Sequence, residues 1–229
     1  MKFIKDIIYI ITNYSSSLLN GLKNTLIIAL LAFVIGLVLG SLIAICRIGS
    51  KKENVFLKIL DKICAVYVTV IRGTPVVVQL LLMYFGVLAL SNLGALTIAI
   101  IVFGLNSSAY MSEIIRSGIL SVDKGQMEAG RTLGLSYSKT MKSIVFPQAI
   151  KNAIPTILNE LIALLKETSV AGYITVIDLT MAVQRIVANE YEALVPYTVL
   201  AIIYLIIVGI LTLGVKAIER RLRRNDSSI

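Results

Sequence analysis

Long apolar runs are the feature that most constrains what this chain can fold into. Five runs approach 20 residues, the length at which an α-helix crosses the hydrocarbon core of a bilayer. Of the 229 residues 57% are hydrophobic and only 15% are charged, whereas a soluble domain carries about 25% charged residues. The polar residues are too few to cover a compact soluble fold. The sequence therefore predicts an all-α transmembrane protein whose surroundings are mostly lipid.

The runs predict five spanning helices in a single domain, residues 1–229. Four residues, Arg72 to Pro75, interrupt the second run, and the fourth run contains charged residues. No internal repeat or Pro-rich linker divides the chain. The segment 1–20 is amphipathic, too short to span and without a signal-peptide cleavage site, so we expect it to remain attached. The predicted spans are residues 25–45, 63–90, 93–110 (with apolar character continuing to 115), 153–177 and 195–215.

The charge distribution predicts the orientation of the chain. The net charge is +9, and sixteen of the 22 Lys and Arg residues fall on one side of the five-span arrangement. Because Lys and Arg collect in cytoplasmic loops, we expect the C-terminus inside and the N-terminus outside. Lys2, Lys5, Lys23 and Arg185 lie on the other side and argue weakly against this. The sixteen are Arg47, Lys51, Lys52, Lys58, Lys62, Arg116, Lys124, Arg131, Lys139, Lys142, Lys151, Lys216, Arg220, Arg221, Arg223 and Arg224.

The interruption of the second run is the first candidate site. Pro75 lacks a backbone donor, and Thr74 before it is biased away from the helical region. Arg72 lies about ten residues into the run, or about 15 Å from its start, so its charge should face protein, water or a ligand rather than lipid. A broken helix at this depth exposes backbone groups that can hold a solute. The alternative is a structural kink in which Arg72 pairs with a carboxylate.

Polar residues at helical spacing in two other runs form a second candidate site. Three of them share a face of the third span at i, i+4 and i+7, and two glutamates seven residues apart share a face of the fourth. Carboxylates on these faces and the cation Arg72 would suit a zwitterionic solute. The alternative is a set of internal ion pairs that hold the helices together. The candidate pathway residues are Arg72, Thr74, Asn106, Tyr110, Glu113, Asn159, Glu160, Lys166 and Glu167.

The charged segment 121–148 between the third and fourth spans is the third candidate site. A helix start is indicated at Ser121 or Asp123, and small residues follow at Ala129, Gly130 and Gly134. Small side chains allow a partner to approach closely. A connection of about 30 residues with helices of its own is long, and long loops are usually functional. The alternative is an ordinary solvated amphipathic loop.

This segment resembles the EAA loop of ATP-binding-cassette (ABC) importer permeases, whose pattern is E-A-A-x3-G-x9-I-x-L-P. Here Glu128-Ala129-Gly130 is followed by Gly134 and by residues 144–147, Ile-Val-Phe-Pro. Gly130 replaces Ala and Phe146 replaces Leu, which keeps the small or apolar character. The chain also resembles the polar amino acid subgroup over residues 20–215, in Arg72-Gly73-Thr74-Pro75 with Gln79, in Tyr110 to Gln126, and in Asn159 with 166–169, Lys-Glu-Thr-Ser.

The resemblance implies a type I importer permease, a multi-pass protein of the bacterial cytoplasmic membrane. In that family the EAA segment is a coupling helix that docks on a cytoplasmic ATPase dimer. The other partners are an extracytoplasmic solute-binding protein and a second permease, expected here to be a second copy of this chain, with a different permease as the alternative. The carried-over coupling residues are Gly125, Gln126, Glu128, Ala129, Gly130, Gly134 and Pro147.

The expected cargo is a polar amino acid. Acidic residues in the candidate pathway favour a cationic one such as arginine, lysine or histidine, with glutamine and cystine left open. The chain has no G-x-x-x-x-G-K-[ST] phosphate loop, so ATP and magnesium should bind the partner ATPase and this chain should hold no cofactor. It also has no His, which removes the commonest metal ligand and proton carrier.

Three other functions are weighed against this one. The first is an ion-coupled secondary transporter in which Glu160 and Glu167 relay protons. The second is an intramembrane enzyme, disfavoured because there is no His, no G-x-S-x-G motif and no metal-ligand cluster. The third is a purely structural membrane subunit, which the buried charges disfavour. The positive charge is explained by membrane topology, so no nucleic-acid partner is expected.

Overall fold

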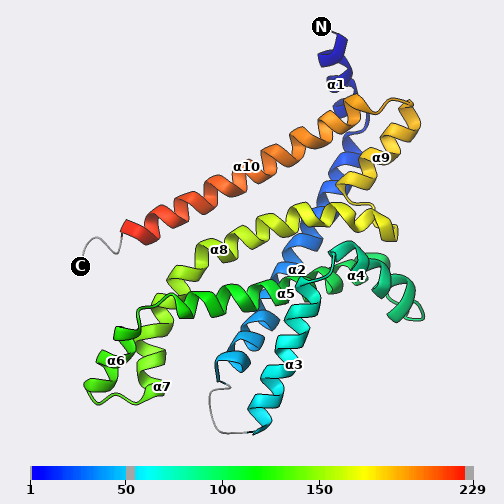
Figure 1. Cartoon of the computed structure of the whole chain (residues 1–229). Coiled ribbons are helices and arrows are strands. Elements are labelled where there is room, and N and C mark those ends of the chain that lie inside the picture. The colour runs from blue at the N-terminus through cyan, green and yellow to red at the C-terminus, as the bar shows by residue number, and fades with distance from the viewer. Residues whose placement is uncertain (1, 50–54, 225–229) are drawn as a thin grey trace.

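The computed structural model describes residues 2–49 and 55–224, and within these ranges the regular elements are all helical (Figure 1). Three helices are long and apolar enough to cross a membrane unaided, over Ser15–Ile48, Ala95–Leu120 and Leu194–Leu222. Two further helix pairs are long and apolar enough only when taken together, and each is bent: Val55–Arg72 with Val76–Val87 by 104° and Tyr137–Ile174 with Leu179–Glu190 by 53°. The described residues thus hold three straight spans, or five when each bent pair is counted as one.

Most of the spanning elements begin earlier in the chain than the apolar runs suggest, and the third begins two residues later, at Ala95. The first straight helix starts at Ser15, ten residues before the predicted start, because its polar first turns find partners: Asn24 Nδ2 donates to the Ile177 carbonyl at 2.9 Å. The elements are α1 Lys2–Asn13, α2 Ser15–Gly49, α3 Val55–Arg72, α4 Val76–Leu82, the π-helical turn η1 Met83–Val87, α5 Ala95–Leu120, α6 Lys124–Thr132, α7 Tyr137–Thr140, the π-helical turn η2 Met141–Val145, α8 Phe146–Glu167, the 3-10 helix η3 Thr168–Ile174, α9 Leu179–Glu190 and α10 Leu194–Arg224.

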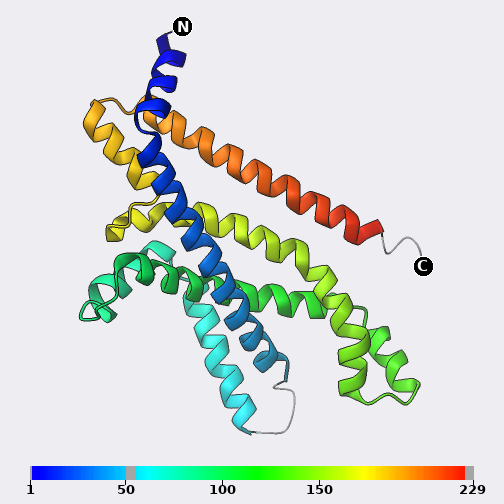
Figure 2. The ribbon, with the colours of Figure 1, turned by 180° about the vertical axis from the view of Figure 1, so that it is seen from behind.

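Close packing of α2 against α5 forms the centre of the fold, and both ribbon views show the two helices crossing (Figures 1 and 2). Gly36 and Gly40 of α2 allow the contact. A Cβ atom on Gly36 would lie 2.7 Å from Ser107 Oγ of α5, and one on Gly40 would lie 2.5 Å from Met111 Cβ of the same helix. Small residues one turn apart bring membrane helices together in this way. The main core beside this contact is built from α2, α4, α5, α8 and η3, with Ile28, Leu80, Phe103, Leu164 and Ile174 among its buried side chains.

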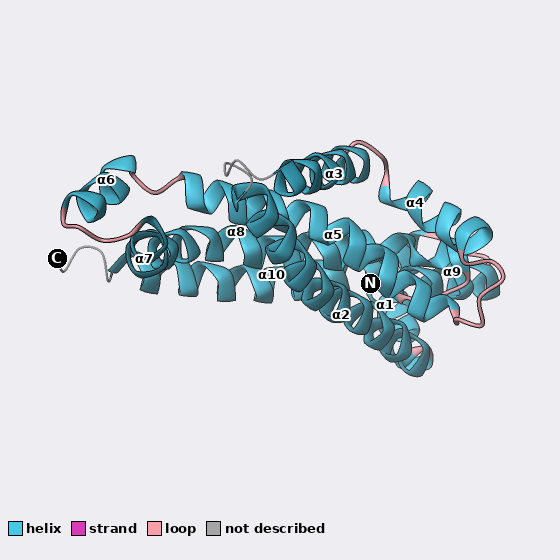
Figure 3. Cartoon of the chain, turned by 90° about the horizontal axis from the view of Figure 1, so that it is seen from below, coloured by secondary structure: helices cyan, strands magenta, loops and turns pink. Residues whose placement is uncertain are grey.

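The segments rich in basic residues lie away from the N-terminus. In Figures 1 and 3 the α6–α7 segment and the C-terminal end of α10 lie on one side of the molecule, while α1, α4 and α9 lie on the other. This grouping agrees with a common face for the basic segments, although the orientation in the membrane stays a prediction. Of the sixteen residues used for it, Lys51 and Lys52 lie outside the described residues.

The N-terminal segment is folded rather than loose. Helix α1 packs on α9 and α10 through Ile10, which is buried. Tyr9 and Tyr14 both donate to Glu190 Oε1 at the end of α9, at 3.4 and 2.6 Å. The bond to the carboxylate raises the pKa of the Tyr14 phenol, because the neutral phenol is the form that donates. The amphipathic segment therefore ends in a polar contact with α9.

Candidate solute pathway and coupling surface

The predicted break in the second span is present. Helix α3 ends at Arg72, α4 begins at Val76, and Pro75 between them is extended, with φ −63° and ψ 135°. The two helices meet at 104°. Because Pro75 has no backbone N–H, the helical ladder cannot continue through it, and the last carbonyls of α3 need other partners.

A side chain from the next turn provides those partners. Gln79 Nε2 donates to the Ile71 carbonyl at 2.8 Å, to the Thr74 carbonyl at 3.1 Å and to Thr74 Oγ1 at 2.8 Å. Thr74 Oγ1 in turn donates to the Val70 carbonyl at 2.8 Å. The backbone groups that the sequence suggested would be open to a solute are thus largely occupied within the break. Thr74, named as a pathway residue, lies inside this hydrogen-bonded cluster.

Arg72 lies at the exposed side of the break, with its guanidinium 5.2 Å from the centre of the Tyr110 ring on α5. It forms no ion pair within residues 2–49 and 55–224, so the alternative of a carboxylate-paired kink is not what the structure shows. A cavity of about 380 Å³ opens beside it. Its lining residues are Arg72, Tyr110, Glu113, Ile114, Ser117, Gly118, Ser121, Asn152, Ala153 and Thr156.

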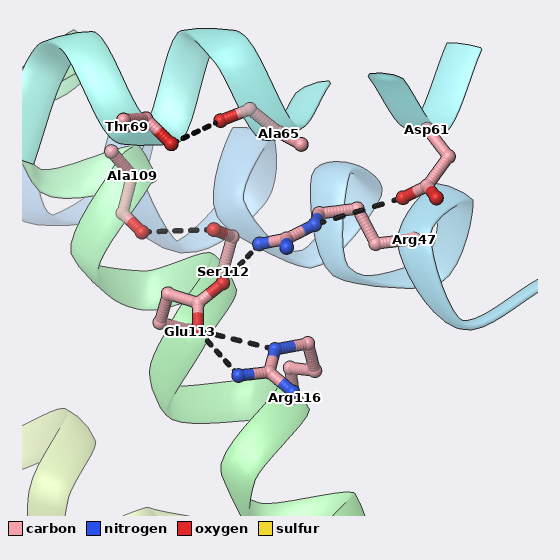
Figure 4. Close-up of polar contacts among 8 residues, drawn as sticks. All are labelled: Arg47, Asp61, Ala65, Thr69, Ala109, Ser112, Glu113 and Arg116. Atoms are coloured by element: carbon pink, nitrogen blue, oxygen red, sulfur yellow. Dashed lines mark hydrogen bonds and ion pairs between the residues drawn. The ribbon is translucent and has the colours of Figure 1, made fainter. Parts of the chain in front are cut away.

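Glu113 faces the same cavity but is held by two arginines (Figure 4). Arg116, one turn along α5, donates to Glu113 Oε2 from Nη2 at 2.7 Å and from Nε at 3.1 Å. Arg47 of α2 donates to the other oxygen, and its Nε lies 3.8 Å from Asp61 Oδ1 on α3. This network joins α2, α3 and α5. At Glu113 the structure therefore matches the alternative of internal ion pairs that hold the helices together.

The remaining candidates divide between the interior and the surface. Asn106 is buried and its Nδ2 donates to Gln79 Oε1 at 3.0 Å. Glu160 is half-buried on α8 and accepts from Ser107 Oγ at 2.9 Å. Both Arg72 and Glu167 lie within electrostatic range of Glu160. Asn159 and Lys166 are exposed on this chain, and Glu167 is half-buried.

Several residues in this region were not among the predicted site residues. Gln79, Ser107 and Asn152 each contact or line the candidate pathway, and Arg47 holds Glu113. Gln79 carried a usable signal, because an amide one helical turn after a proline break can reach back to the freed carbonyls. Arg47 carried none, since a basic residue at the end of a span also fits an ordinary interfacial anchor.

The coupling segment is ordered by its own caps. Helix α6 starts after Asp123, whose Oδ1 accepts from the Gly125 N–H at 2.6 Å, which confirms the predicted start. The helix ends in a Schellman motif: Gly134 N–H donates to the Arg131 carbonyl at 3.0 Å and Leu135 N–H to the Gly130 carbonyl at 3.1 Å. Gly134 has the positive φ, 82°, that this motif requires. Glycine adopts such a φ without the steric cost that other residues meet.

One face of α6 packs inward and the other is exposed. Met127 contacts the small core formed by Val122, Val145 and Ala149. Glu128 and Ala129 are exposed, and Leu133 at the end of the helix is 80% exposed. An apolar side chain this exposed beside small residues is typical of a protein contact surface. Of the other coupling candidates, Gly125 and Gln126 are exposed on α6 and Pro147 lies in the first turn of α8.

Gly130 occupies the position where the EAA pattern has alanine, and the structure gives a reason for the change. The residue is buried, and a Cβ atom there would lie 2.4 Å from Thr140 Cγ2 and 3.0 Å from Thr140 Oγ1. Thr140 is itself fully buried and donates to the Ser136 carbonyl at 3.1 Å. Glycine therefore sets how closely α6 approaches α7.

This contact yields a test of the coupling segment. We expect Gly130→Ala to lower the melting temperature of the purified protein and the uptake rate of the assembled complex, because the new methyl group overlaps Thr140; overpacking of this kind costs about 1–3 kcal/mol. Thr140→Ser removes Cγ2 but keeps the hydroxyl, so the double variant should recover most of both losses. Both variants are measured by thermal unfolding and by uptake. Equal losses in the single and the double variant would contradict the contact between Gly130 and Thr140.

Comparisons with known proteins agree with this architecture. Residues 36–224 match the family described as binding-protein-dependent transport system inner membrane component. The arginine transport system permease protein ArtQ of Bacillus subtilis (strain 168) is 41% identical over 211 residues, 91% of this chain and 94% of that protein. The L-cystine transport system permease protein TcyB of the same organism is 40% identical over 206 residues, 89% of this chain and 86% of that protein.

A solved structure shows the same fold. The crystal structure of an amino acid ABC transporter with histidines aligns with a TM-score of 0.86 and 37% sequence identity, over 92% of this chain and 96% of that one. The chain therefore belongs to the family of binding-protein-dependent transport system inner membrane components. It is a membrane permease subunit of an ABC importer and not the ATPase, and the family works with ATPase and solute-binding partners.

Proposed function

We propose that this chain is the permease of an ATP-driven importer of polar amino acids. The observation that carries the proposal is the cavity at the helix break, where Arg72 has no carboxylate partner within the described residues and faces the Tyr110 ring. A guanidinium held on a polar cavity wall is suited to bidentate binding of a carboxylate. The relatives transport, by their names, arginine and cystine, which both carry an α-carboxylate.

The opposite charge needed for an ammonium group comes from α8. Glu160 accepts one hydrogen bond, from Ser107, so its carboxylate has further capacity to accept. Arg72 acts on it electrostatically, which supports a route that offers both a cation and a carboxylate. Glu167 lies two turns further along the same face of α8. Two acidic side chains on one face of α8, against the single arginine Arg72, favour a cationic amino acid over a neutral one.

The exposed face of α6 is the proposed ATPase contact. Glu128, Ala129 and Leu133 present a charge, a small side chain and an apolar anchor on a helix whose ends are both capped. Capping at both ends should let a displacement of α6 reach the spans, because Met127 of α6 contacts Val145 at the end of η2 and Ala149 in the first turn of α8. In this scheme two copies of the chain face two ATPases, and closure of the ATPases drives alternating access of the cavity.

The test is reconstitution with the partners. The chain is co-expressed with the ATPase encoded beside it, purified and placed in proteoliposomes with the solute-binding protein outside. We expect ATP-dependent uptake of radiolabelled arginine in preference to glutamine and cystine, and no uptake with an ATPase that binds but cannot hydrolyse ATP. Uptake driven by a proton gradient without the ATPase would overturn the proposal. Preference for glutamine or cystine would overturn only the cationic assignment.

A further inference from the structure

The hydrogen bonds at the helix break single out Gln79. In the proposed scheme this residue does not contact the solute, but it lies beside Arg72, which does. The Gln79 amide is engaged on both sides: Nε2 donates to the Ile71 and Thr74 carbonyls and to the Thr74 hydroxyl, and Oε1 accepts from Asn106 Nδ2. Its orientation is fixed because two of the partners on the nitrogen side are backbone carbonyls, which only accept. Exchanging the amide nitrogen and oxygen would set oxygen against oxygen.

These bonds connect three pieces of chain at one point. Ile71 is the residue before Arg72 at the end of α3, Thr74 lies in the break, and Asn106 is buried on α5. Helix α4 has no side-chain cap of its own at Pro75. The 104° bend between α3 and α4 is therefore bridged by a side chain that reaches back from inside α4, together with the Thr74 hydroxyl in the break.

Helix α5 receives two contacts from this corner on one face. Asn106 and Tyr110 are four residues apart, so they lie one above the other on α5. Asn106 binds Gln79, and the ring of Tyr110 lies 5.2 Å from the Arg72 guanidinium. The Gln79–Asn106 bond thus sets the distance between the break and the face of α5 that carries Tyr110, the ring against which Arg72 lies.

We propose that Gln79 is a positioning residue: its amide, clamped between the break and Asn106, holds Arg72 over Tyr110 in the orientation that receives the carboxylate of the solute. The inference rests on the proposed function, because it needs Arg72 to bind the transported solute. It adds that Asn106 and Thr74 belong to the clamp rather than to the solute-contacting surface.

The test is a double-mutant cycle in the reconstituted complex, with radiolabelled arginine as the probe. Gln79→Leu removes the amide at similar size, and we expect it to raise KM about tenfold, about 1.4 kcal/mol, with kcat within twofold of wild type. If Gln79 acts through Arg72, the same change in an Arg72→Ala background should alter KM less than twofold. An equal KM change in both backgrounds, or loss confined to kcat, would overturn the positioning role.

A second variant tests the same role even if Gln79→Leu fails to fold. Thr74→Val is nearly isosteric and lies at the exposed break, but it removes the hydroxyl that accepts from Gln79 and donates to Val70. It should show the same dependence on Arg72 with a KM increase of about threefold, while the matched control Thr74→Ser should stay within twofold of wild type. If Arg72→Ala itself leaves KM unchanged, the proposed function of Arg72 in solute binding is wrong. If Arg72→Ala raises KM but both Gln79→Leu and Thr74→Val are fully active, the positioning role of Gln79 is wrong and the proposed function stands.

Discussion

Replacing Gly134 by valine is expected to separate ATP hydrolysis from transport. The residue has φ 82° and closes the Schellman motif at the end of α6, and a β-branched side chain at such a φ costs about 1–3 kcal/mol. The end of α6 should rearrange and carry Leu133 with it. We expect uptake and the stimulation of the ATPase by loaded binding protein to fall at least tenfold, measured on the reconstituted complex.

A matched variant distinguishes backbone strain from steric exclusion of the partner. Apart from Gly134 and its two chain neighbours, no atom of the described residues lies within 4 Å of a Cβ built at Gly134, so the methyl group itself meets open space there. Asparagine tolerates a positive φ better than other residues with a side chain. If strain dominates, Gly134→Asn should keep most of the stimulation; if the ATPase packs directly on Gly134, both variants should fail. Normal stimulation in Gly134→Val would contradict the coupling role.

Arg72→Ala is expected to have the second large effect. A hydrogen bond to a charged group contributes about 1.5–3 kcal/mol, so loss of the carboxylate contact should raise KM for the transported amino acid by about 10- to 150-fold. The complex should still assemble with its ATPase, because Arg72 is exposed and its contact within the described chain is the Tyr110 ring. Uptake kinetics and size-exclusion profiles of the same preparations measure the two quantities.

Two conservative variants sharpen that experiment. Arg72→Lys keeps the charge but loses the planar guanidinium that stacks on a ring and binds carboxylate at two points, so its KM should lie between wild type and Arg72→Ala. Tyr110→Phe keeps the ring face and should stay close to wild type, since the attraction of a cation to a ring depends on the face. Loss of assembly in Arg72→Ala with an unchanged KM in the surviving complex would favour a purely structural role.

The sequence was sufficient for the elements that depend on hydrophobic length and on single strong signals. Apolar runs located the three long apolar helices and both bent helix pairs, Pro75 located the break, and Asp123 marked the start of α6. The starts of spans were missed where polar residues continue a helix, as at Ser15, because the partners that satisfy them lie far along the chain. Local patterns carry no information about those distant partners.

The candidate site was predicted in kind but not in arrangement. Helical spacing placed Asn106, Tyr110 and Glu113 on one face of α5, and that face does meet the break. Spacing does not tell which side chains are already satisfied by protein groups: Asn106 binds Gln79 and Glu113 binds two arginines. The guanidinium of Arg72, which has no ion-pair partner among the residues that the structure describes, became distinguishable from its neighbours once the contacts between helices were known.

The most direct measurement of the central claim is equilibrium binding of radiolabelled arginine to the purified permease–ATPase complex without the solute-binding protein. Saturable binding at one site per permease is expected, because each chain carries its own Arg72 and Glu160, the groups proposed to bind the carboxylate and the ammonium of the solute. Glu160→Gln is nearly isosteric, keeps an acceptor for Ser107 and removes the negative charge, so it should weaken binding at least tenfold. Binding that is absent in wild type under these conditions, or equally tight in Glu160→Gln, would contradict the account.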